Sequence, residues 1–432
     1  MNREQERAKR RPEKNPVVEY NKIQNKYYPE LFAKFAEVND PRNQSYIEYP
    51  VRVMLGTMYY KCISGISSMQ EMTLKFNDDA VVENLYSFMS EEKKEYLPHG
   101  VIENEFLARL NPEELEKIQK DIAYSMIRRK TFDDARVLKR WQIIIDATEL
   151  DEGYQKKNEY YLSRCYNRGE ADEFTKYHRS VLEAKLYLGN NLVCSIASEA
   201  IQNSEEYINQ SEKKIKQDCE SKAFIRVAEK IKKQFPRLPI IITADGLYVS
   251  QKVIQTCTDN SWNYIIRYKK GSASSIAKES SAFACARPVC IMVSNSSFDN
   301  ASLVVKVLGI SNQIMFQNTD VNLTYYTEKK IKPDEKKETT EFAWIADITI
   351  TKNNARKIVN AGRNRWKIEN QGFNRQKHWR GNIEHACSWN EQAQKNHYLM
   401  EQIADFIKQL YEYYYLKKNE INLPFKTNKN FA

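Results

Sequence analysis

The sequence predicts a mixed α/β fold that follows a helical N-terminal region. Two isoleucine-rich runs of the length of buried strands occur at 141–147 and 239–244. Stretches with apolar residues at helical spacing lie before the first run and between the two. The chain has 432 residues, of which 41% are hydrophobic and 12% aromatic. This length favours about two or three domains, and the composition is sufficient for a sizeable core.

The first part of the chain is predicted to be helical. Residues 1–16 are basic and contain two prolines, so we expect an arm before a helical region at 17–140. Within that region, Tyr46–Cys62 has helical spacing, Ser64-Gly65 interrupts it, and a second short helix extends to Phe76. Two helices joined by a glycine turn are compatible with a helix-turn-helix DNA reader, and equally with an ordinary helical bundle. We predict that this region binds DNA, and both interpretations of its fold stay open.

After Arg140 the pattern changes to alternating strands and helices. The turn signal Gly189-Asn190-Asn191 separates two of the strands and indicates a hairpin. In chain order we expect strands at 141–147, 180–188 and 192–197, a helix at 212–235, a strand at 239–244, a helix at 249–258 and a strand at 262–268. This is the element order of the ribonuclease-H-like (retroviral-integrase-like) fold, in which acidic residues lie at adjoining strand ends.

The remaining chain divides into three further parts. Short strand-like runs at 288–293, 302–308, 313–317 and 323–327, separated by turn residues, indicate a mainly β insertion at 271–345. The catalytic core is therefore predicted to comprise residues 141–270 and 346–390, on either side of the insertion. Residues 391–432 are expected to form a C-terminal helix and tail.

Three carboxylates stand at positions that suit metal-dependent chemistry. Asp146 and Asp245 each end an isoleucine run, and Glu369 lies in a basic helical stretch. Two divalent ions held by such acids can activate a nucleophile and stabilise a leaving oxygen in phosphoryl transfer. Mg²⁺ prefers oxygen ligands and is the expected ion. Any one of these acids alone is more often an ordinary solvated residue. The acids weighed as alternatives lie in polar contexts and are Glu149, Asp151 and Asp218.

The stretch around Glu369 mixes cations with aromatic residues. Arg365 precedes Glu369 by four residues and shares its helical face, so it can hold a phosphate beside the acid. Such a mixture fits a groove for a DNA backbone and unstacked bases, although a core-facing aromatic stripe is the alternative. The expected nucleic-acid-binding residues are Arg365, Trp366, Lys367, Arg375, Gln376, Lys377 and Arg380.

Charge and cysteine content narrow the functional class. The 67 Lys and Arg against 57 Asp and Glu give a net charge of +10, which suits a polyanionic partner. The polar start, the absence of a long apolar run and the eight scattered cysteines predict a reduced intracellular protein without a membrane span. His378, His385, His397 and Cys387 lie within twenty residues. Their spacing fits no compact zinc pattern, so packing roles are the better interpretation.

With these motifs in place, the chain resembles the DDE transposases of bacterial insertion sequences, in the branch with a β-rich insertion before the catalytic glutamate. The resemblance covers nearly the whole length. It rests on Asp-Pro-Arg-Asn (40–43), Ile-Ile-Asp-Ala-Thr (144–148), Val-Leu-Glu-Ala-Lys-Leu (181–186), Lys-Gln-Asp-Cys-Glu (216–220), Ala-Asp-Gly-Leu-Tyr (244–248) and Arg-Trp-Lys-Ile-Glu-Asn-Gln-Gly-Phe-Asn (365–374). By this resemblance Asp146, Asp245 and Glu369 are the catalytic, metal-binding triad, and Arg365 matches the arginine before the glutamate.

The chain departs from the family signature Tyr-x2-Arg-x3-Glu-x6-Lys at two positions. Gly362 stands at the tyrosine position and Gln376 at the lysine position, with Lys377 one residue later. A one-residue offset turns a helical side chain by about 100°. The first motif also reads Asp-Ala-Thr where Asp-Gly-Thr is common among relatives.

The resemblance implies a bacterial DNA transposase located in the cytoplasm and associated with the nucleoid. It would bind the terminal inverted repeats of its element as a homodimer or larger assembly, cleave the ends and join the 3′-hydroxyl to target DNA. Two Mg²⁺ ions per site are implied, with Mn²⁺ able to substitute. Two alternatives are a nuclease of the same fold that only cleaves, and a transposase-derived DNA-binding protein without catalysis. Gly362 and Gln376 are the features that favour the second.

Overall fold

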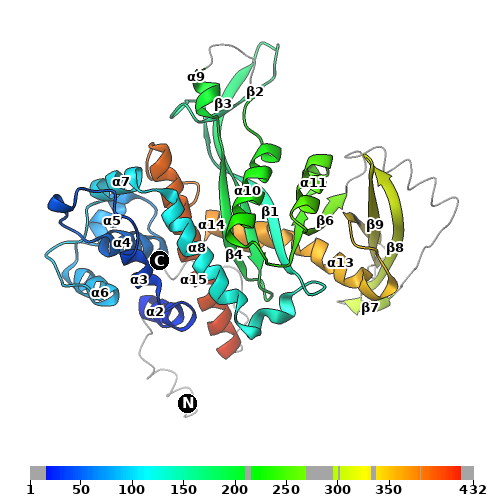
Figure 1. Cartoon of the computed structure of the whole chain (residues 1–432), viewed down its shortest axis with the longest axis horizontal. Coiled ribbons are helices and arrows are strands. Elements are labelled where there is room, and N and C mark those ends of the chain that lie inside the picture. The colour runs from blue at the N-terminus through cyan, green and yellow to red at the C-terminus, as the bar shows by residue number, and fades with distance from the viewer. Residues whose placement is uncertain are drawn as a thin grey trace.

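The computed structural model describes residues 16–209, 216–268, 295–299, 302–331, 337–379 and 381–419. A helical N-terminal region packs beside a ten-stranded mixed sheet that has helices on both faces (Figure 1). The predicted α/β class with a helical N-terminal region is therefore confirmed. None of the helices in these ranges is both long enough and apolar enough to cross a membrane.

The N-terminal region is built around one central helix. Its helices are α2 (Pro16–Tyr27), α3 (Leu31–Ala36), α4 (Val51–Ile63), α5 (Met69–Lys75), α6 (Asp79–Met89), α7 (Gly100–Arg109) and α8 (Pro112–Ile127), with short 3-10 helices η1 (Gln44–Tyr46) and η2 (Lys130–Ala135). Every residue of α4 from Val53 to Ile63 is buried. A helix that is buried all round forms the centre of a bundle. The helix that follows the glycine turn, α5, begins after Ser68, whose side chain accepts a hydrogen bond from Glu71 N.

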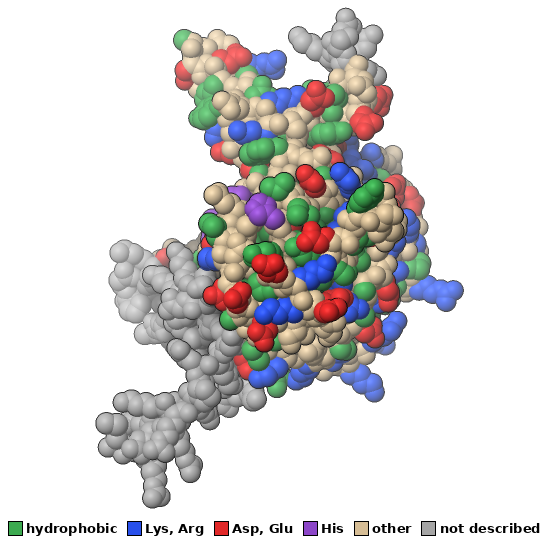
Figure 2. Space-filling view, turned by 90° about the vertical axis from the view of Figure 1, so that its left-hand side faces the viewer, with side chains coloured by type: hydrophobic (Ala, Val, Ile, Leu, Met, Phe, Trp, Pro, Cys, Tyr) green, Lys and Arg blue, Asp and Glu red, His purple; other side chains and the backbone are tan. Residues whose placement is uncertain are grey.

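The surface of this region is mixed in charge. Figure 2 shows the side of the molecule on which the N-terminal helices lie. Among the described residues on that face, acidic and basic side chains are interspersed with hydrophobic ones, and they do not form a single basic stripe. A stripe of one sign is the usual electrostatic mark of a phosphate-binding face. This face therefore gives no support to DNA binding by the N-terminal helices, and that binding stays a prediction.

The sheet is continuous from one edge to the other. Its strands are β1 (Trp141–Gly153), β2 (Leu162–Tyr166), β3 (Phe174–Tyr187), β4 (Val193–Ile201), β5 (Ile240–Ala244), β6 (Asn263–Tyr268), β7 (Asn295–Asp299), β8 (Ser302–Phe316), β9 (Thr319–Ile331) and β10 (Lys337–Ala346). The order is β2-β3-β1-β5-β6-β10-β9-β8-β7, and β4 also pairs with β3. Strands β1, β5 and β6 are parallel, whereas β3 runs antiparallel to β1 and β4 antiparallel to β3.

Helices cover both faces of the central strands. They are α9 (Glu205–Asn209), α10 (Glu220–Gln234), η3 (Gly246–Tyr248), α11 (Gln251–Asp259), α13 (Lys352–Asn364), the π-helix η4 (Ile368–Phe373), α14 (Asn374–His378) and α15 (Glu391–Asn419). Ile143 and Ile145 pack in the core cluster that contains α10, whereas Ile144 packs with Ile368 and Phe373 of η4. Because successive strand residues point to opposite faces, Asp146 lies on the same face as Ile144, toward η4.

Several boundaries differ from those predicted. Strands β1 and β3 extend well beyond the isoleucine-rich runs, and β2, which was not predicted, pairs with the extension of β3 at the top of Figure 1. Polar residues in these extensions hid their strand character. Helix α10 begins at Glu220 rather than at Glu212, and residues 210–215 lie outside the described ranges. The hairpin at Gly189–Asn191 is confirmed, and all three of its residues have positive φ.

The strands of the predicted insertion continue the central sheet. Strand β10 pairs with β6 on one side and with β9 on the other. The two runs expected at 302–308 and 313–317 are one strand, β8, with a register shift between Ser311 and Ile314. The run expected at 288–293 lies outside the described residues. Core and insertion therefore share one hydrogen-bonded sheet.

Candidate active site

Asp146 and Asp245 come from neighbouring parallel strands. Ile144 of β1 pairs with Thr243 of β5, and each acid follows its paired residue by two positions. Strand β5 ends before Asp245, whose side chain accepts a hydrogen bond from Leu247 N at 2.7 Å and caps η3. Strand β1 continues beyond Asp146. The parallel register thus places the two predicted acids at matching positions, Asp146 within β1 and Asp245 directly after β5.

Arg365 joins Asp146 to Glu369. Arg365 follows α13 directly, and its side chain reaches the sheet with only 7% of its surface exposed. Its Nη1 donates to Asp146 Oδ2 at 2.8 Å, and its Nη2 lies 3.8 Å from Glu369 Oε2. A buried guanidinium requires negative partners to offset its loss of hydration. Arg365 therefore bridges Asp146 on β1 and Glu369 on the π-helix.

The surroundings of Asp146 disfavour the ionised form of its carboxyl group. Burial raises its pKa, the Arg365 guanidinium opposes this rise, and the carboxylates of Asp245 and Glu220 add to it, with a resulting pKa of about 7. Negative charges that crowd a partly buried carboxyl group disfavour its ionised form. A cation placed among these carboxylates would therefore be stabilised.

Glu220 is a fourth carboxylate that the sequence interpretation missed. It is the first residue of α10, and its Oε2 accepts a hydrogen bond from the Tyr248 hydroxyl at 2.8 Å. Burial raises the pKa of Glu220, and Asp245 contributes in the same direction although Tyr248 opposes it. Both residues stand in motifs that carried the family resemblance, at 216–220 and 244–248. The motif positions were a signal, but the polar sequence around Glu220 concealed its burial.

The π-helix accounts for the displaced lysine. A π-helical turn contains one more residue than an α-helical turn. Lys377, eight residues after Glu369, consequently occupies the direction that the seventh residue has in a regular α-helix. Its Nζ donates to Glu149 O on β1 at 2.6 Å and lies 2.9 Å from Glu384 Oε1. Lys377 therefore faces the strand that carries Asp146.

Gln376 points away from the acids. It is fully buried, and its Nε2 donates to Gln402 Oε1 at 2.8 Å and to Asp405 Oδ2 at 2.9 Å, both on α15. Arg375 also faces α15, where its Nη1 lies 2.6 Å from Glu412 Oε2. Both side chains pack against α15, so the structure gives no support to their contact with nucleic acid, which stays a prediction.

The remaining predicted nucleic-acid contacts have different surroundings. Trp366 is 37% exposed, and its ring lies 5.0 Å from the Arg365 guanidinium and 5.6 Å from that of Arg267. Lys367 reaches the 189–191 hairpin, where its Nζ donates to Asn191 Oδ1 at 2.6 Å, and burial lowers its pKa. Arg380 lies outside the described residues.

Gly362, at the tyrosine position of the family signature, packs against Trp344. A Cβ atom added to Gly362 would lie 2.4 Å from Trp344 Nε1, which is too close for any larger side chain without movement. Trp344 comes from β10, is almost completely buried and stacks on Phe342. The Trp344 indole therefore fills the space that a tyrosine side chain at position 362 would need.

The acids weighed as alternatives form ion pairs away from this centre. Each pairs with an arginine: Glu149 with Arg164 at 3.4 Å, Asp151 with Arg179 at 2.8 Å and Asp218 with Arg226 at 2.6 Å.

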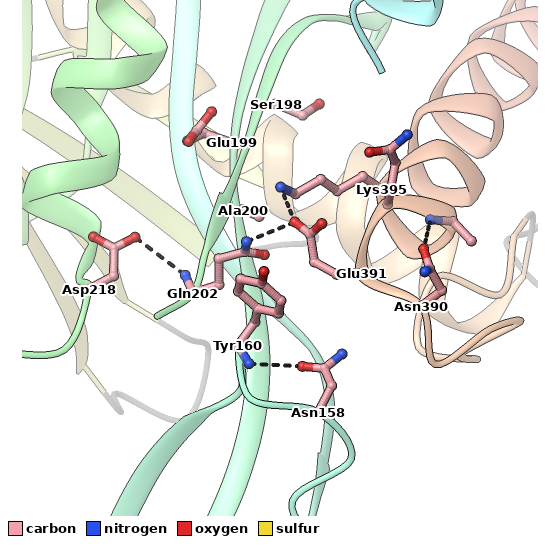
Figure 3. A network of polar contacts seen from close by, with 12 residues as sticks. Asn158, Tyr160, Ser198, Glu199, Ala200, Gln202, Asp218, Asn390, Glu391 and Lys395 are labelled. Atoms are coloured by element: carbon pink, nitrogen blue, oxygen red, sulfur yellow. Dashed lines mark hydrogen bonds and ion pairs between the residues drawn. The ribbon is translucent and has the colours of Figure 1, made fainter. Parts of the chain in front are cut away.

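The pair formed by Asp218 belongs to a network that fastens the start of α15 to the end of β4 (Figure 3). There Gln202 N donates to Asp218 Oδ2 at 3.3 Å and Gln202 Nε2 donates to Glu391 Oε1 at 2.8 Å, while Glu391 also pairs with Lys395. Structural ion pairing explains these acids without a catalytic role.

The carboxylates fit a divalent cation by their chemistry. Carboxylate oxygens are the ligands that Mg²⁺ prefers. Within the described ranges, however, no group of three or more His, Cys, Asp or Glu side chains is arranged to hold a metal ion. Arg365 lies between Asp146 and Glu369 and supplies the positive charge there.

The comparison of the chain with protein families agrees with this geometry. Residues 216–400 match the model of the transposase DDE domain, a range that contains Asp245, Arg365 and Glu369 and begins after Asp146. The comparison with curated proteins found no match. This match confirms that the chain resembles the DDE transposases.

Proposed function

We propose that this protein is a DNA transposase that cleaves the ends of its element and joins them to target DNA by metal-dependent phosphoryl transfer. The observation that carries the proposal is the bridge from Arg365 to Asp146 and Glu369, beside Asp245 at the end of β5. We infer a ribonuclease-H-like core. The spatial order β4-β3-β1-β5-β6, with β1, β5 and β6 parallel, supports this inference.

The roles of the side chains follow from their positions. Transposases of this family generally use divalent metal ions. Asp146, Asp245 and Glu369 are the residues that would hold such ions, here Mg²⁺ or Mn²⁺. When bound, two ions activate the attacking oxygen and stabilise the leaving oxygen. Arg365 orients Asp146 and Glu369 and offsets their charge, and its fixed fork of donors suits a phosphate. Lys377 places a second positive charge along β1.

The DNA partners are inferred from the chemistry and the family. A net charge of +10 favours a polyanionic substrate. The exposed ring of Trp366, flanked by Arg365 and Arg267, offers an aromatic surface with adjacent cations beside the carboxylates. We propose that the substrates are the terminal inverted repeats and the target DNA. A homodimer or larger assembly would hold two ends together in the cytoplasm, close to the nucleoid.

A cleavage and strand-transfer assay tests the proposal. The inverted repeats that flank the reading frame supply labelled duplex ends, and a supercoiled plasmid supplies the target. We expect products cut at the repeat ends and joined to the plasmid, in the presence of Mg²⁺ or Mn²⁺ only. Asp245→Asn and Glu369→Gln should abolish both products, whereas Asp259→Asn on the exposed side of α11 should retain them.

The same assay separates the alternatives. A cleaving-only nuclease would release repeat ends without joining them to the plasmid. A DNA-binding protein without catalysis would retain the repeat duplex and yield no metal-dependent product. Gly362 and Gln376 favoured this second alternative. However, Trp344 fills the space beside Gly362, and the π-helix turns Gln376 away from the carboxylates. These explanations support the catalytic proposal.

A further inference from the structure

A buried lysine on α4 has a cysteine thiol as its neighbour. Lys61 is 4% exposed, and its Nζ donates to Ser67 O at 3.3 Å and lies 3.6 Å from Cys387 Sγ. Burying an ammonium group is costly unless an anion or several hydrogen bonds offset the loss of water. Burial lowers the pKa of Lys61, but Cys387, Cys62 and Glu401 raise it by more. The cysteine sulfur is therefore positioned as an anionic partner of Lys61.

The surroundings of Cys387 favour the thiolate. The sulfur also lies 3.4 Å from Ser67 O and 3.7 Å from His385 Nδ1. Burial alone would raise the pKa of this thiol, but His397 and Lys61 together lower it to about 7. A nearby cation or histidine is the usual cause of an activated cysteine in proteins. At neutral pH a large fraction of Cys387 is therefore ionised.

A small cavity gives access to the sulfur. Its volume is about 40 Å³, and its lining includes Lys61, His385, Cys387, His397 and Glu401. A water molecule needs roughly 10–15 Å³ of such space, so the cavity accepts a molecule of two or three heavy atoms. Hydrogen peroxide meets this limit, whereas a tripeptide disulfide such as oxidised glutathione exceeds it. His385 is exposed and Cys387 partly exposed, so the cavity lies close to solvent.

We propose that Cys387 is a peroxide-reactive thiol, a modification site separate from the catalytic carboxylates. The thiolate attacks one oxygen of hydrogen peroxide, so that an S–O bond forms and the O–O bond breaks. The sulfur loses two electrons and the peroxide gains them, and the leaving hydroxide takes a proton from solvent to become water. The product is a sulfenic acid, which thiols can reduce again.

Oxidation at this position acts on the contact between two parts of the protein. Cys387 lies between α14 and α15, and its carbonyl oxygen accepts a hydrogen bond from Asn104 of α7 at 3.0 Å. Asn104 also contacts His397 Nε2 at 2.7 Å, and Lys61 belongs to α4. A neutral sulfenic acid leaves Lys61 buried without the charge of the thiolate. Oxidation is therefore expected to weaken the packing of the N-terminal helices on the segment before α15.

Chemical labelling of the full-length protein tests the proposal. The reduced protein is treated with substoichiometric hydrogen peroxide and then unfolded, sulfenic acid is trapped with dimedone in the unfolded chain, and modified peptides are identified by mass spectrometry. Cys387 should react before Cys165 and Cys219, although these two cysteines are more exposed. Earlier reaction of Cys165 or Cys219 would overturn the proposal.

A pH series of the hydrogen peroxide oxidation rate gives a second measurement that needs no variant. The oxidation rate of Cys387 should reach half of its maximum near pH 7, well below the midpoint for Cys165, whose pKa is raised. An equal midpoint for both would contradict an activated thiol. The titratable and charged groups around the sulfur are Lys61 and Cys62 from α4, His385 from the same segment, His397 and Glu401 from α15, and Arg179 from β3.

Variants with and without the Lys61 ammonium group show whether this cation activates Cys387. Lys61→Met should slow the peroxide oxidation of Cys387 by about fivefold at pH 7, because loss of the ion pair moves the midpoint from about pH 7 to about pH 8. Lys75→Met, at an exposed position on α5, should leave the rate unchanged. If Lys61→Met does not fold, the wild-type labelling order and pH midpoint still decide the question.

Discussion

Arg365 Nη1 donates a hydrogen bond of 2.8 Å to Asp146 Oδ2, and the same guanidinium lies 3.8 Å from Glu369. This contact joins residues that are 219 positions apart in the chain. It connects the strand acid to the helix acid through a group that is itself buried. The proposed catalytic arrangement should therefore depend on the shape of this side chain as well as on its charge.

The first prediction concerns the shape of Arg365. Arg365→Ala should reduce the rate of end cleavage by about 100-fold or more, a typical loss when one preorganised donor is removed from an active site. Arg365→Lys keeps the charge but loses the planar fork, so we expect an intermediate rate. Single-turnover cleavage measures both variants. Wild-type cleavage by Arg365→Ala would show that the bridge is dispensable.

The second prediction concerns pH and follows from the raised pKa of Asp146, about 7. The native state holds this proton between the unfolded pKa of about 4 and about pH 7, while the unfolded state does not. In the absence of metal, the stability that Asp146 contributes is thus greatest below about pH 4 and declines as the pH rises to about 7.

Metal ions should reverse this trend because they compete with the proton. The rise in melting temperature caused by Mn²⁺ should be larger at about pH 8 than at about pH 6. Asp146→Asn should make the rise small and nearly independent of pH. Differential scanning fluorimetry provides the measurement. An equal Mn²⁺ effect at both pH values in the wild type would count against Asp146 as a ligand.

The third prediction concerns the packing of Gly362 on Trp344. Gly362→Tyr should lower the free energy of unfolding by about 1–3 kcal/mol or more, because the new ring overlaps the indole. Trp344→Ala should cost about 3–5 kcal/mol through the cavity that it leaves. The double variant should lose less than the sum, since the tyrosine can occupy the vacated space.

Urea unfolding of the four proteins measures this coupling. Gly153→Ala is the control, because a Cβ atom at Gly153 meets no atom within 4 Å. Strict additivity of the two substitutions would mean that they do not share one space.

The fourth prediction separates Lys377 from Gln376. Lys377→Gln should reduce cleavage by about tenfold or more, because the variant loses the positive charge that reaches β1 from α14. The melting temperature should change little, because Lys377 is only partly buried. Adding Gln376→Lys to this variant recreates the family spacing in sequence. It should fail to restore cleavage and should lower the melting temperature, because Gln376 is buried against α15. Rescue of cleavage would refute the proposed effect of the π-helix.

Strand order and acid placement were predictable from local sequence. An isoleucine run indicates a strand that is buried on both faces. When two such strands are parallel neighbours, the residues that follow the two runs lie at the same edge of the sheet. This reasoning placed Asp146 beside Asp245, as the register of β1 and β5 confirms. It also placed Arg365 on the face of Glu369, as their contact confirms.

Other features depend on contacts between distant segments and left little trace in local sequence. A single π-helical turn leaves no recognisable pattern in the sequence. The one-residue offset of Lys377 therefore looked like the loss of the signature lysine. The packing of Trp344 against Gly362 joins β10 to α13, and the burial of Gln376 requires α15. Glu220 was not identified as a candidate, and its partner Tyr248 is 28 residues away in the chain.

The pairing of β10 with both β6 and β9 has a mechanical consequence. Backbone hydrogen bonds run without interruption from β8 through β9, β10 and β6 to β5, the strand that leads to Asp245. We expect a displacement of β9 to pass through these hydrogen bonds to β5, so the position of Asp245 depends on strands that lie far along the sheet.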